Sequence, residues 1–309
     1  MRLSFSKLAG VGLLICSGLL LSACDAISTT QQAEGNIELQ RITDTGEVSW
    51  TYGCLGTAQD AIEDLNCRKI RIGVENAYLP FNYIEAKTGL AGGWDYEAWN
   101  AVCTRLHCAP VFVETPWDGM IDAVANREFD VGADGITIND ERKEKVDFSD
   151  AYISIEQRLL VRSDEARFEN IQELADQDDL KVGSQDGTTN LDTAIEYVGD
   201  ERVTPYAQFP EAIQALLDGD IDAVVIDETT GQGYVTQNGD ALKMVGPSLS
   251  SDQLGFIFPK GSDLVGPVNK ALASMRSAGV LETLAVSYFG PFFQITQEDI
   301  APPSYSTQP

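Results

Sequence analysis

One pattern occurs twice in this chain and limits the folds open to it: an amphipathic helix, a turn, and a short buried strand. Residues 117–133 form the first copy and residues 210–226 the second. In each copy apolar residues recur with the helical period and then run together as a strand. An acid follows each strand, Asp134 in the first copy and Asp227 in the second. Strands and helices alternate around both copies, which predicts two α/β lobes with mostly parallel sheets flanked by helices.

Periodicity and turn residues also place the remaining elements. Strands are predicted at 69–74, 111–113, 129–133, 159–161, 180–183, 202–206, 221–226 and 254–258, and helices at 99–106, 117–124, 189–197, 210–217, 264–276 and 280–289. The pattern divides the chain into a first lobe (69–153 plus 254–293), a second lobe (154–253) and a C-terminal tail (294–309). Two crossings between the lobes would act as a hinge.

The stretch from residue 131 to residue 142 has the character of a ligand site. It runs from a strand through Gly135 and Thr137 to Asn139, a good helix N-cap, and then to Arg142. Hydroxyls, free backbone N–H groups and a guanidinium at the carboxyl edge of a sheet favour a bound anion, most naturally a carboxylate. The alternative is an ordinary loop with a solvated arginine.

The first 24 residues are typical of an export signal. Arg2 and Lys7 precede an apolar run too short to span a membrane comfortably, and the run ends in Leu-Ser-Ala-Cys at Cys24. That ending resembles the bacterial lipobox, so residues 1–23 are predicted to be removed and Cys24 to carry lipid. A plain secretory signal with an incidental cysteine is the alternative. Residues 24–68 then form a polar tether, to about residue 45, and a disulfide-stapled extension.

Four cysteines remain in the exported chain, which is an even number in an oxidising compartment. The expected pairs are Cys54–Cys67 and Cys103–Cys108, each closing a short loop. A zinc site made of all four thiolates is the competing interpretation, although the two spacings do not both match the usual ligand pairs. No cofactor and no metal are expected.

The net charge of −27 excludes nucleic-acid binding by phosphate neutralisation. The chain contains no Ser-His-Asp set, no His-Glu-x-x-His motif and no Walker-type glycine loop. Its single histidine, His107, stands beside Cys108 and away from the strand ends. We therefore expect a monomeric binding protein and not an enzyme.

Several short phrases carry a family resemblance across residues 69–290. They are 70–73 (IRIG), 78–81 (YLPF), 92–97 (GGWDYE), 117–120 (WDGM) with 129–130 (FD), 135–142 (GITINDER), 146–149 (VDFS), 187–189 (GTT) and 220–227 (DIDAVVID). Their order and spacing resemble the family 3 extracellular solute-binding proteins, the polar amino-acid receptors of ABC importers. The resemblance implies the two-lobed periplasmic-binding-protein fold (type II), an amino acid as ligand and a permease in the inner membrane as partner. The Cys103–Cys108 pair also stands where some members carry a disulfide.

The resemblance assigns roles to the two ends of an amino acid. Arg142 would grip the α-carboxylate, helped by Thr137, the backbone near Gly135, and the donors of Thr188 and Thr189. Asp227 would bind the α-ammonium, because each charge of a zwitterion can be desolvated only beside an opposite partner. Asp227 as a helix cap is the structural alternative, and a surface position is the alternative for Arg142.

The side-chain pocket implied by the resemblance contains two aromatic residues and two acids. Tyr78 and Trp117 match positions that sandwich the ligand side chain, although Trp117 could equally be core. Glu75 occupies a place often held by an acid, whereas Asp134 departs from the small or hydroxyl residue of many relatives. These carboxylates favour arginine, lysine or ornithine.

Three alternatives remain open at this point. If an acid of the pocket pairs with Lys87 or Arg71, the pocket suits glutamine or histidine instead. The fold also hosts exported dehydratases of the cyclohexadienyl type, which would need Glu75 or Asp134 as a catalytic acid or base. A sensory domain is the third alternative.

Overall fold

In the computed structural model, which describes residues 39–44, 47–290 and 292–307, a seven-stranded sheet is built around β3 (Arg68–Val74). The alternating residues Ile70, Ile72 and Val74 are fully buried, as the β-branched pattern predicts. In spatial order the sheet contains β1 (Gln40–Asp44), β2 (Glu47–Thr51), β7 (Cys108–Glu114), β3, β8 (Val131–Gly132), β15 (Ile257–Pro259) and β9 (Val146–Phe148).

A separate five-stranded sheet forms the core of the second lobe. Its order is β12 (Val203–Tyr206), β11 (Val182–Gln185), β13 (Ala223–Asp227), β10 (Ile153–Arg162) and β14 (Leu242–Leu254). Short strands β4 (Ala77–Tyr78), β5 (Asn82–Glu85), β6 (Ala91–Gly92) and β16 (Ile300–Ala301) make a small antiparallel sheet.

The prediction of mostly parallel sheets is wrong, because both large sheets are mixed. Among the strands that the structure describes, only the pairs of β3 with β7 and β8, and of β11 with β12 and β13, are parallel. In the second lobe, the strands that carry the chain in and out account for the difference. Strand β10 leaves the region where the lobes meet and β14 returns to it, so the two pair antiparallel from Ile153↔Leu254 onward. Because β14 runs back along β10 in the opposite direction, the two strands form an antiparallel pair.

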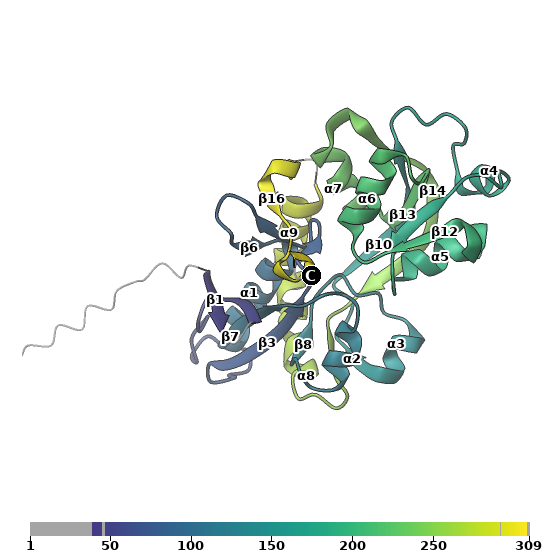
Figure 1. Cartoon of the computed structure of the whole chain (residues 1–309). Coiled ribbons are helices and arrows are strands. Elements are labelled where there is room, and N and C mark those ends of the chain that lie inside the picture. Colours follow the sequence, from purple (N-terminus) through teal and green to yellow (C-terminus); the bar gives the residue numbers. More distant parts are fainter. Residues whose placement is uncertain (1–38, 45–46, 291, 308–309) are drawn as a thin grey trace, which may run out of the picture. The chain divides into compact units, whose positions relative to one another are not determined.

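The helices lie beside these sheets (Figure 1). Helices α4 (Ile171–Ala175), α5 (Thr189–Val198), α6 (Phe209–Asp218) and α7 (Glu228–Gln237) belong to the second lobe, and α1 (Trp94–Leu106), α2 (Met120–Ala125), α3 (Asp140–Lys145), α8 (Val265–Ser277) and α9 (Val280–Phe289) to the first. Short 3-10 turns occupy Asp200–Arg202, Gly239–Ala241, Gln297–Asp299 and Ser304–Thr307. None of the helices in the described part of the chain is long and apolar enough to cross a membrane.

Two segments predicted to be irregular are ordered on the first lobe. Residues 40–44, expected within the tether, form β1, which pairs with β2 and so extends the main sheet. Residues 300–301 of the expected tail form β16, which pairs with β5. In both cases a distant partner strand decides the structure, and local sequence does not reveal it. The predicted signal (1–23) and Cys24 lie outside the described residues.

The cysteines join as Cys54–Cys67 and Cys103–Cys108, with Cα atoms 5.4 and 4.7 Å apart. Because all four sulfurs are used in disulfides, the structure does not fit the competing four-thiolate zinc site.

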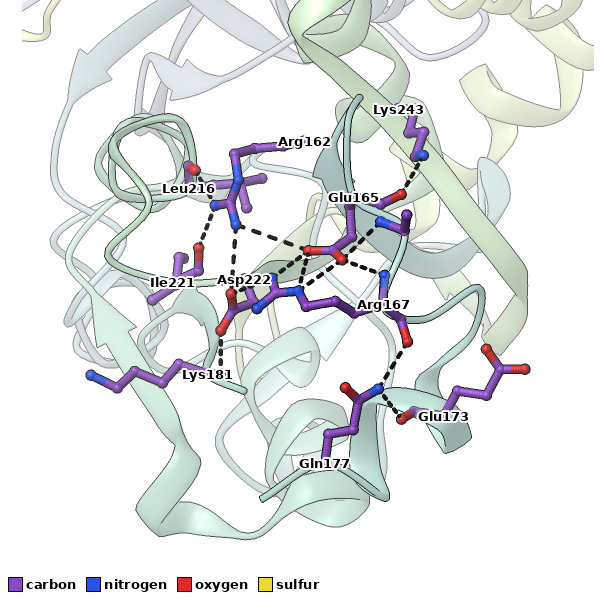
Figure 2. A network of polar contacts seen from close by, with 11 residues as sticks. Arg162, Glu165, Arg167, Glu173, Gln177, Lys181, Leu216, Ile221, Asp222 and Lys243 are labelled. Atoms are coloured by element: carbon purple, nitrogen blue, oxygen red, sulfur yellow. Dashed lines mark hydrogen bonds and ion pairs between the residues drawn. The ribbon is translucent and has the colours of Figure 1, made fainter. Parts of the chain in front are cut away.

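An ion-pair network around the buried Glu165 secures the second lobe at the end of its sheet away from Asp227 (Figure 2). The side chain of Glu165 is only 2% exposed and accepts hydrogen bonds from the Arg167 guanidinium and from the backbone N–H groups of Ala166 and Arg167. Arg167 also pairs with Asp222, whose other oxygen accepts the backbone N–H of Lys181 at 2.8 Å. The network thus joins the end of β10 to the starts of β11 and β13.

Replacing Glu165 by glutamine is expected to lower the free energy of unfolding by about 2 kcal/mol, since charged hydrogen bonds contribute about 1.5–3 kcal/mol. Arg167 holds the pKa of Glu165 at about 2, below its ordinary value. This stabilisation is therefore present above about pH 4.5 and lost as the pH falls towards 2. Urea unfolding at pH 7 and pH 3 measures both effects. Glu196→Gln, at an exposed position of α5, is the matched control and should change the free energy by less than about 0.5 kcal/mol.

Candidate functional site

Four strands end at one place between the two sheets. Glu75 follows β3, Asp134 follows β8, Gln185 ends β11 and Asp227 ends β13. These residues line a small cavity of about 30 Å³. All ten residues predicted to bind the ligand line this cavity: Glu75, Tyr78, Trp117, Asp134, Gly135, Thr137, Arg142, Thr188, Thr189 and Asp227. Gln185, Asn190 and Phe209 complete the lining.

Arg142 is buried at the edge of the cavity and is not the exposed residue of the alternative interpretation; it is 8% exposed. It lies in α3, whose predicted N-cap Asn139 accepts the backbone N–H of Arg142 at 2.8 Å. Its guanidinium donates to the backbone oxygens of Thr137 (3.1 Å) and Gly187 (3.4 Å) and lies 5.2 Å from the centre of the Trp117 ring. Burial lowers the pKa of Arg142 from its ordinary value. Among the described residues Arg142 has no carboxylate within ion-pair distance, so it is suited to an anionic ligand.

Asp227 lines the same cavity as Arg142 and ends β13. Its side chain makes no cap hydrogen bond to α7, unlike the structural alternative. Instead it accepts from Tyr78 Oη and from Asn190 Nδ2, the latter at 2.8 Å. Burial raises the pKa of Asp227 to about 6, although the Tyr78 and Asn190 hydrogen bonds oppose the shift. Each carboxylate oxygen can accept a further hydrogen bond, which leaves capacity for a ligand ammonium.

Aromatic rings form the walls of the cavity. Tyr78 stacks on Phe81 and Phe209, with ring centres 5.1 and 5.6 Å apart. The Tyr78 ring also lies close to the backbone of Gly135, at φ +57°. Only glycine allows this, because a Cβ at residue 135 would lie 2.5 Å from Tyr78 Cε1. Trp117 both lines the cavity and packs in the core beside α2, so its position is compatible with either interpretation of this residue.

The threonines surround the start of α5. Thr188 caps this helix by accepting the backbone N–H of Leu191 at 3.2 Å and donates to the backbone oxygen of Gln185 at 2.7 Å. The hydroxyls of Thr189 and Thr137 lie 3.4 Å apart across the two lobes. A helix N-terminus with hydroxyls next to Arg142 favours negative charge.

Glu75 and Asp134 are buried acids that lie near each other, 1% and 5% exposed. Burial raises the pKa of Asp134 to about 7; for Glu75, burial and then the nearby Asp134 raise the pKa well above its ordinary value. Neither acid pairs with Arg71 or Lys87 in the described chain, as one alternative required, since Arg71 binds Glu47 at 2.8 Å. A cation bound next to the pair would favour the charged form of each acid.

Neutral amides hold both acids in place. Gln185 Nε2 donates to Glu75 at 2.6 Å, and Asn82 Nδ2 donates to Asp134 at 2.6 Å and to the buried Asp95 at 2.9 Å. Gln185, Asn190 and Phe209 are not among the residues predicted from the sequence. The position of Gln185 at the carboxyl end of a predicted strand was a usable signal, and so was that of Asn190 in the first turn of a predicted helix.

The C-terminal segment, residues 294–307, also reaches the back of the site. The phenol of Tyr305 donates to the backbone oxygen of Glu75 at 2.8 Å. The backbone N–H of Ser304 donates to Glu114 at 2.7 Å, and the same carboxylate accepts from Asn76 at 2.9 Å. The segment predicted to be a tail therefore fixes the loop that carries Glu75.

A larger cavity of about 220 Å³ lies between α6, α7 and the C-terminal segment. Its lining is mostly apolar and includes no charged residue. It offers no partner for the charges of an amino acid, and the smaller cavity is therefore the better candidate.

Comparison with known proteins agrees with this geometry. Residues 70–291 match the bacterial extracellular solute-binding proteins, family 3. The chain belongs to this family. The match includes the whole five-stranded sheet and every residue that lines the smaller cavity, and of the seven-stranded sheet it leaves out β1, β2 and the first two residues of β3.

Relatives and solved structures share most of their length with the chain. The L-cystine-binding protein TcyJ of Escherichia coli K12 is 31% identical over 71% of this chain and 82% of its own length. The L-arginine-binding protein of Pseudomonas aeruginosa is 30% identical over 72% of this chain and 88% of its own. An ancestral arginine-binding protein, solved bound to glutamine, is 32% identical with a TM-score of 0.67, over 72% of this chain and 98% of its own.

These likenesses confirm the predicted two-lobed periplasmic-binding-protein fold, with mixed sheets. They also show that the relatives are solute-binding proteins and not enzymes. His107 lies away from the cavity, beside Cys67 and Asp64.

Proposed function

We propose that this protein is the substrate-binding component of an ABC importer and captures an amino acid, most readily arginine, lysine or ornithine, in the cavity between its lobes. The observation that carries the proposal is a single cavity lined by Arg142, by Asp227 and by the acid pair Glu75 and Asp134. A cationic amino acid has one negative and two positive charges, and this lining has a partner for each.

The two ends of the ligand would be bound from opposite lobes. Arg142 takes the α-carboxylate in a bidentate pair, with Thr137, the backbone near Gly135, and the start of α5 adding donors. Asp227 takes the α-ammonium. The cationic side chain then lies between the rings of Tyr78, Trp117 and Phe209 and ends at the acid pair. Like-charge repulsion rejects glutamate and aspartate.

A neutral polar amino acid such as glutamine is the second candidate, favoured by the raised pKa values of Glu75 and Asp134. With a proton on the pair, the pocket presents an O–H donor and the amide of Gln185. A ligand cation would favour loss of these protons, and removing each proton costs about 1.4 kcal/mol for every unit by which the pKa exceeds the pH. The relatives' names, which include cystine and arginine, are compatible with either ligand class.

Capture would proceed by closure about the two crossings near residues 153 and 254. Contacts between the lobes support this: Tyr78 to Asp227, Gln185 to Glu75, and Arg142 to the backbone of Gly187. Ligand contacts to both lobes would stabilise the closed form, which docks on a membrane permease. Cleavage after residue 23 and acylation of Cys24 would hold the exported monomer at the membrane.

A thermal-shift screen over the amino acids tests the proposal. A ligand at about a hundred times its dissociation constant should add about 2.7 kcal/mol of stability. We expect the largest shifts from arginine, lysine or ornithine. A larger response to glutamine identifies the second candidate, and a largest response to glutamate, a sugar or a metal contradicts both.

Replacing Tyr305 by phenylalanine is expected to weaken binding of the best cationic ligand about fivefold. The change removes the donor to the backbone of Glu75, and one hydrogen bond contributes about 1 kcal/mol. Calorimetric titration gives the affinity. Tyr288→Phe is the control, because the Tyr288 ring packs on Phe293 in the same region but does not line the cavity. Equal affinities for the two variants would show that the Tyr305 hydrogen bond does not contribute to ligand binding.

A further inference from the structure

A cluster of reactive side chains lies outside the binding cavity, at the Cys54–Cys67 disulfide. His107 Nε2 is 3.1 Å from Cys67 Sγ, and His107 Nδ1 is 2.7 Å from the Asp64 carboxylate. Cys54 and Cys67 are both exposed residues. The imidazole thus contacts a sulfur through one nitrogen and a carboxylate through the other, and such an arrangement stabilises a thiolate.

The backbone holds this line of groups in place. His107 closes α1 in the left-handed conformation, at φ 52°, and its backbone oxygen accepts the backbone N–H of Cys67 at 2.9 Å. Asp64 accepts the backbone N–H of Asn66 at 2.8 Å, which fixes the carboxylate that orients the imidazole. The Asn66 hydrogen bond, followed by His107, lowers the pKa of Asp64 from its ordinary value. The carboxylate therefore stays charged beside the ring.

The second disulfide provides an internal contrast. Cys103 and Cys108 are fully buried in the core of the first lobe. Among the described residues, only Cys54 and Cys67 lie with a histidine in one such group of donor atoms. The two disulfides of one molecule therefore differ in both access and chemistry.

From this geometry we propose that Cys54–Cys67 is a thiol–disulfide exchange site at which an external thiol attacks Cys54 and Cys67 leaves. The inference does not rest on the proposed binding function.

The exchange is balanced with the thiol as the only co-reactant. The external sulfur forms a bond to Cys54 Sγ as the Cys54–Cys67 bond breaks, and the electron pair of that bond stays on Cys67. The proton of the external thiol goes to His107 Nε2, which leaves an imidazolium beside the Cys67 thiolate. With a dithiol, the second thiol attacks the mixed disulfide and releases Cys54. The dithiol is then oxidised to a disulfide and the two cysteines are reduced.

Timed opening of the folded protein by dithiothreitol, followed by alkylation and peptide mass spectrometry, tests the site. Cys54–Cys67 is expected to open at least about tenfold faster than Cys103–Cys108. His107→Asn should slow the opening of Cys54–Cys67 roughly tenfold and leave the rate at Cys103–Cys108 unchanged. Asparagine is chosen because it tolerates the left-handed backbone at this position. Asp64→Asn is a second variant, expected to slow opening about threefold, and serves if His107→Asn fails to fold.

A monothiol arm reports the direction of attack. Glutathione should form its mixed disulfide on Cys54, whereas the dithiol opens the bridge completely. Three results would overturn the proposal: an adduct on Cys67, equal opening rates in the native protein and both variants, or faster opening at Cys103–Cys108.

Discussion

Replacing Arg142 by alanine is expected to abolish the thermal shift produced by every amino acid, whether cationic or neutral. Arg142 is the cation of the cavity, and the α-carboxylate is common to all of these ligands. Removing one partner of a buried, hydrogen-bonded charge pair costs about 2–5 kcal/mol, or roughly thirtyfold to a few thousandfold in affinity. Calorimetric titration with the best ligand from the screen measures the loss.

The same substitution should leave the unliganded protein about as stable as before. Arg142 makes two hydrogen bonds to backbone oxygens, but within the described chain it forms no ion pair whose loss would expose an opposite charge. Burial of the Arg142 charge is itself unfavourable for folding, and the alanine variant does not bear this cost. A lost ligand shift with an unchanged melting point therefore separates a binding role from a structural role. A drop of several degrees in the unliganded melting point would indicate a structural role.

Two further variants sharpen the interpretation. Arg142→Lys keeps the charge but loses the planar fork, so it should recover only part of the affinity. Lys143→Ala removes an exposed cation one position along α3 and should bind normally. A native affinity in Arg142→Lys would show that a positive charge alone is sufficient at this position.

Much of the site could be predicted because strand ends in α/β sheets meet at one edge. Glu75, Asp134 and Asp227 each follow a strand that alternation or an apolar run identifies, and the three line one cavity. The helix start at Asn139 was likewise local information, since a short polar side chain caps a helix through its own neighbours.

The parts that failed depend on distant partners. The direction of β10 and β14 is set by where the chain enters and leaves the second lobe, and β1 and β16 exist only through pairing with β2 and β5.

Helix α7 was not predicted, because its glycines lower the local helix propensity. The backbone at Gly231 packs so close to Met244 that a Cβ would lie 2.6 Å from its sulfur. Tertiary packing thus explains a residue that lowers helix propensity.

Removing the acid pair is expected to reverse the ligand preference of the cavity. Glu75→Gln combined with Asp134→Asn keeps the size of both side chains but leaves no negative charge opposite the ligand's cation. The affinity for arginine or lysine should fall about a hundredfold or more, since a charge partner at a buried site contributes about 2–5 kcal/mol. The affinity for glutamine should change much less. Glu196→Gln is the control, because Glu196 is exposed and does not line the cavity.

The pH dependence of binding tests the same pair in the unaltered protein. Burial raises the pKa of Asp134 to about 7, so below pH 7 a ligand cation must displace a proton. Affinity for the cation should then rise by up to about tenfold per pH unit from pH 5 to pH 7. The unliganded protein should show the opposite trend. Its free energy of unfolding falls as the pH rises from about 4 to 7, because the folded state keeps a proton that the unfolded chain releases.

Asp227 complicates a simple titration, because its pKa of about 6 affects the binding of every amino acid. The ratio of the affinities for arginine and glutamine removes this shared contribution. That ratio should increase with pH in the native protein and stay flat in the Glu75→Gln, Asp134→Asn variant. Titrations in two buffers of different ionisation enthalpy count the protons released, with about one expected for arginine at pH 6 beyond the number for glutamine. A native ratio independent of pH would show that the acids do not face the ligand's cation, and the cavity would then suit a neutral amino acid.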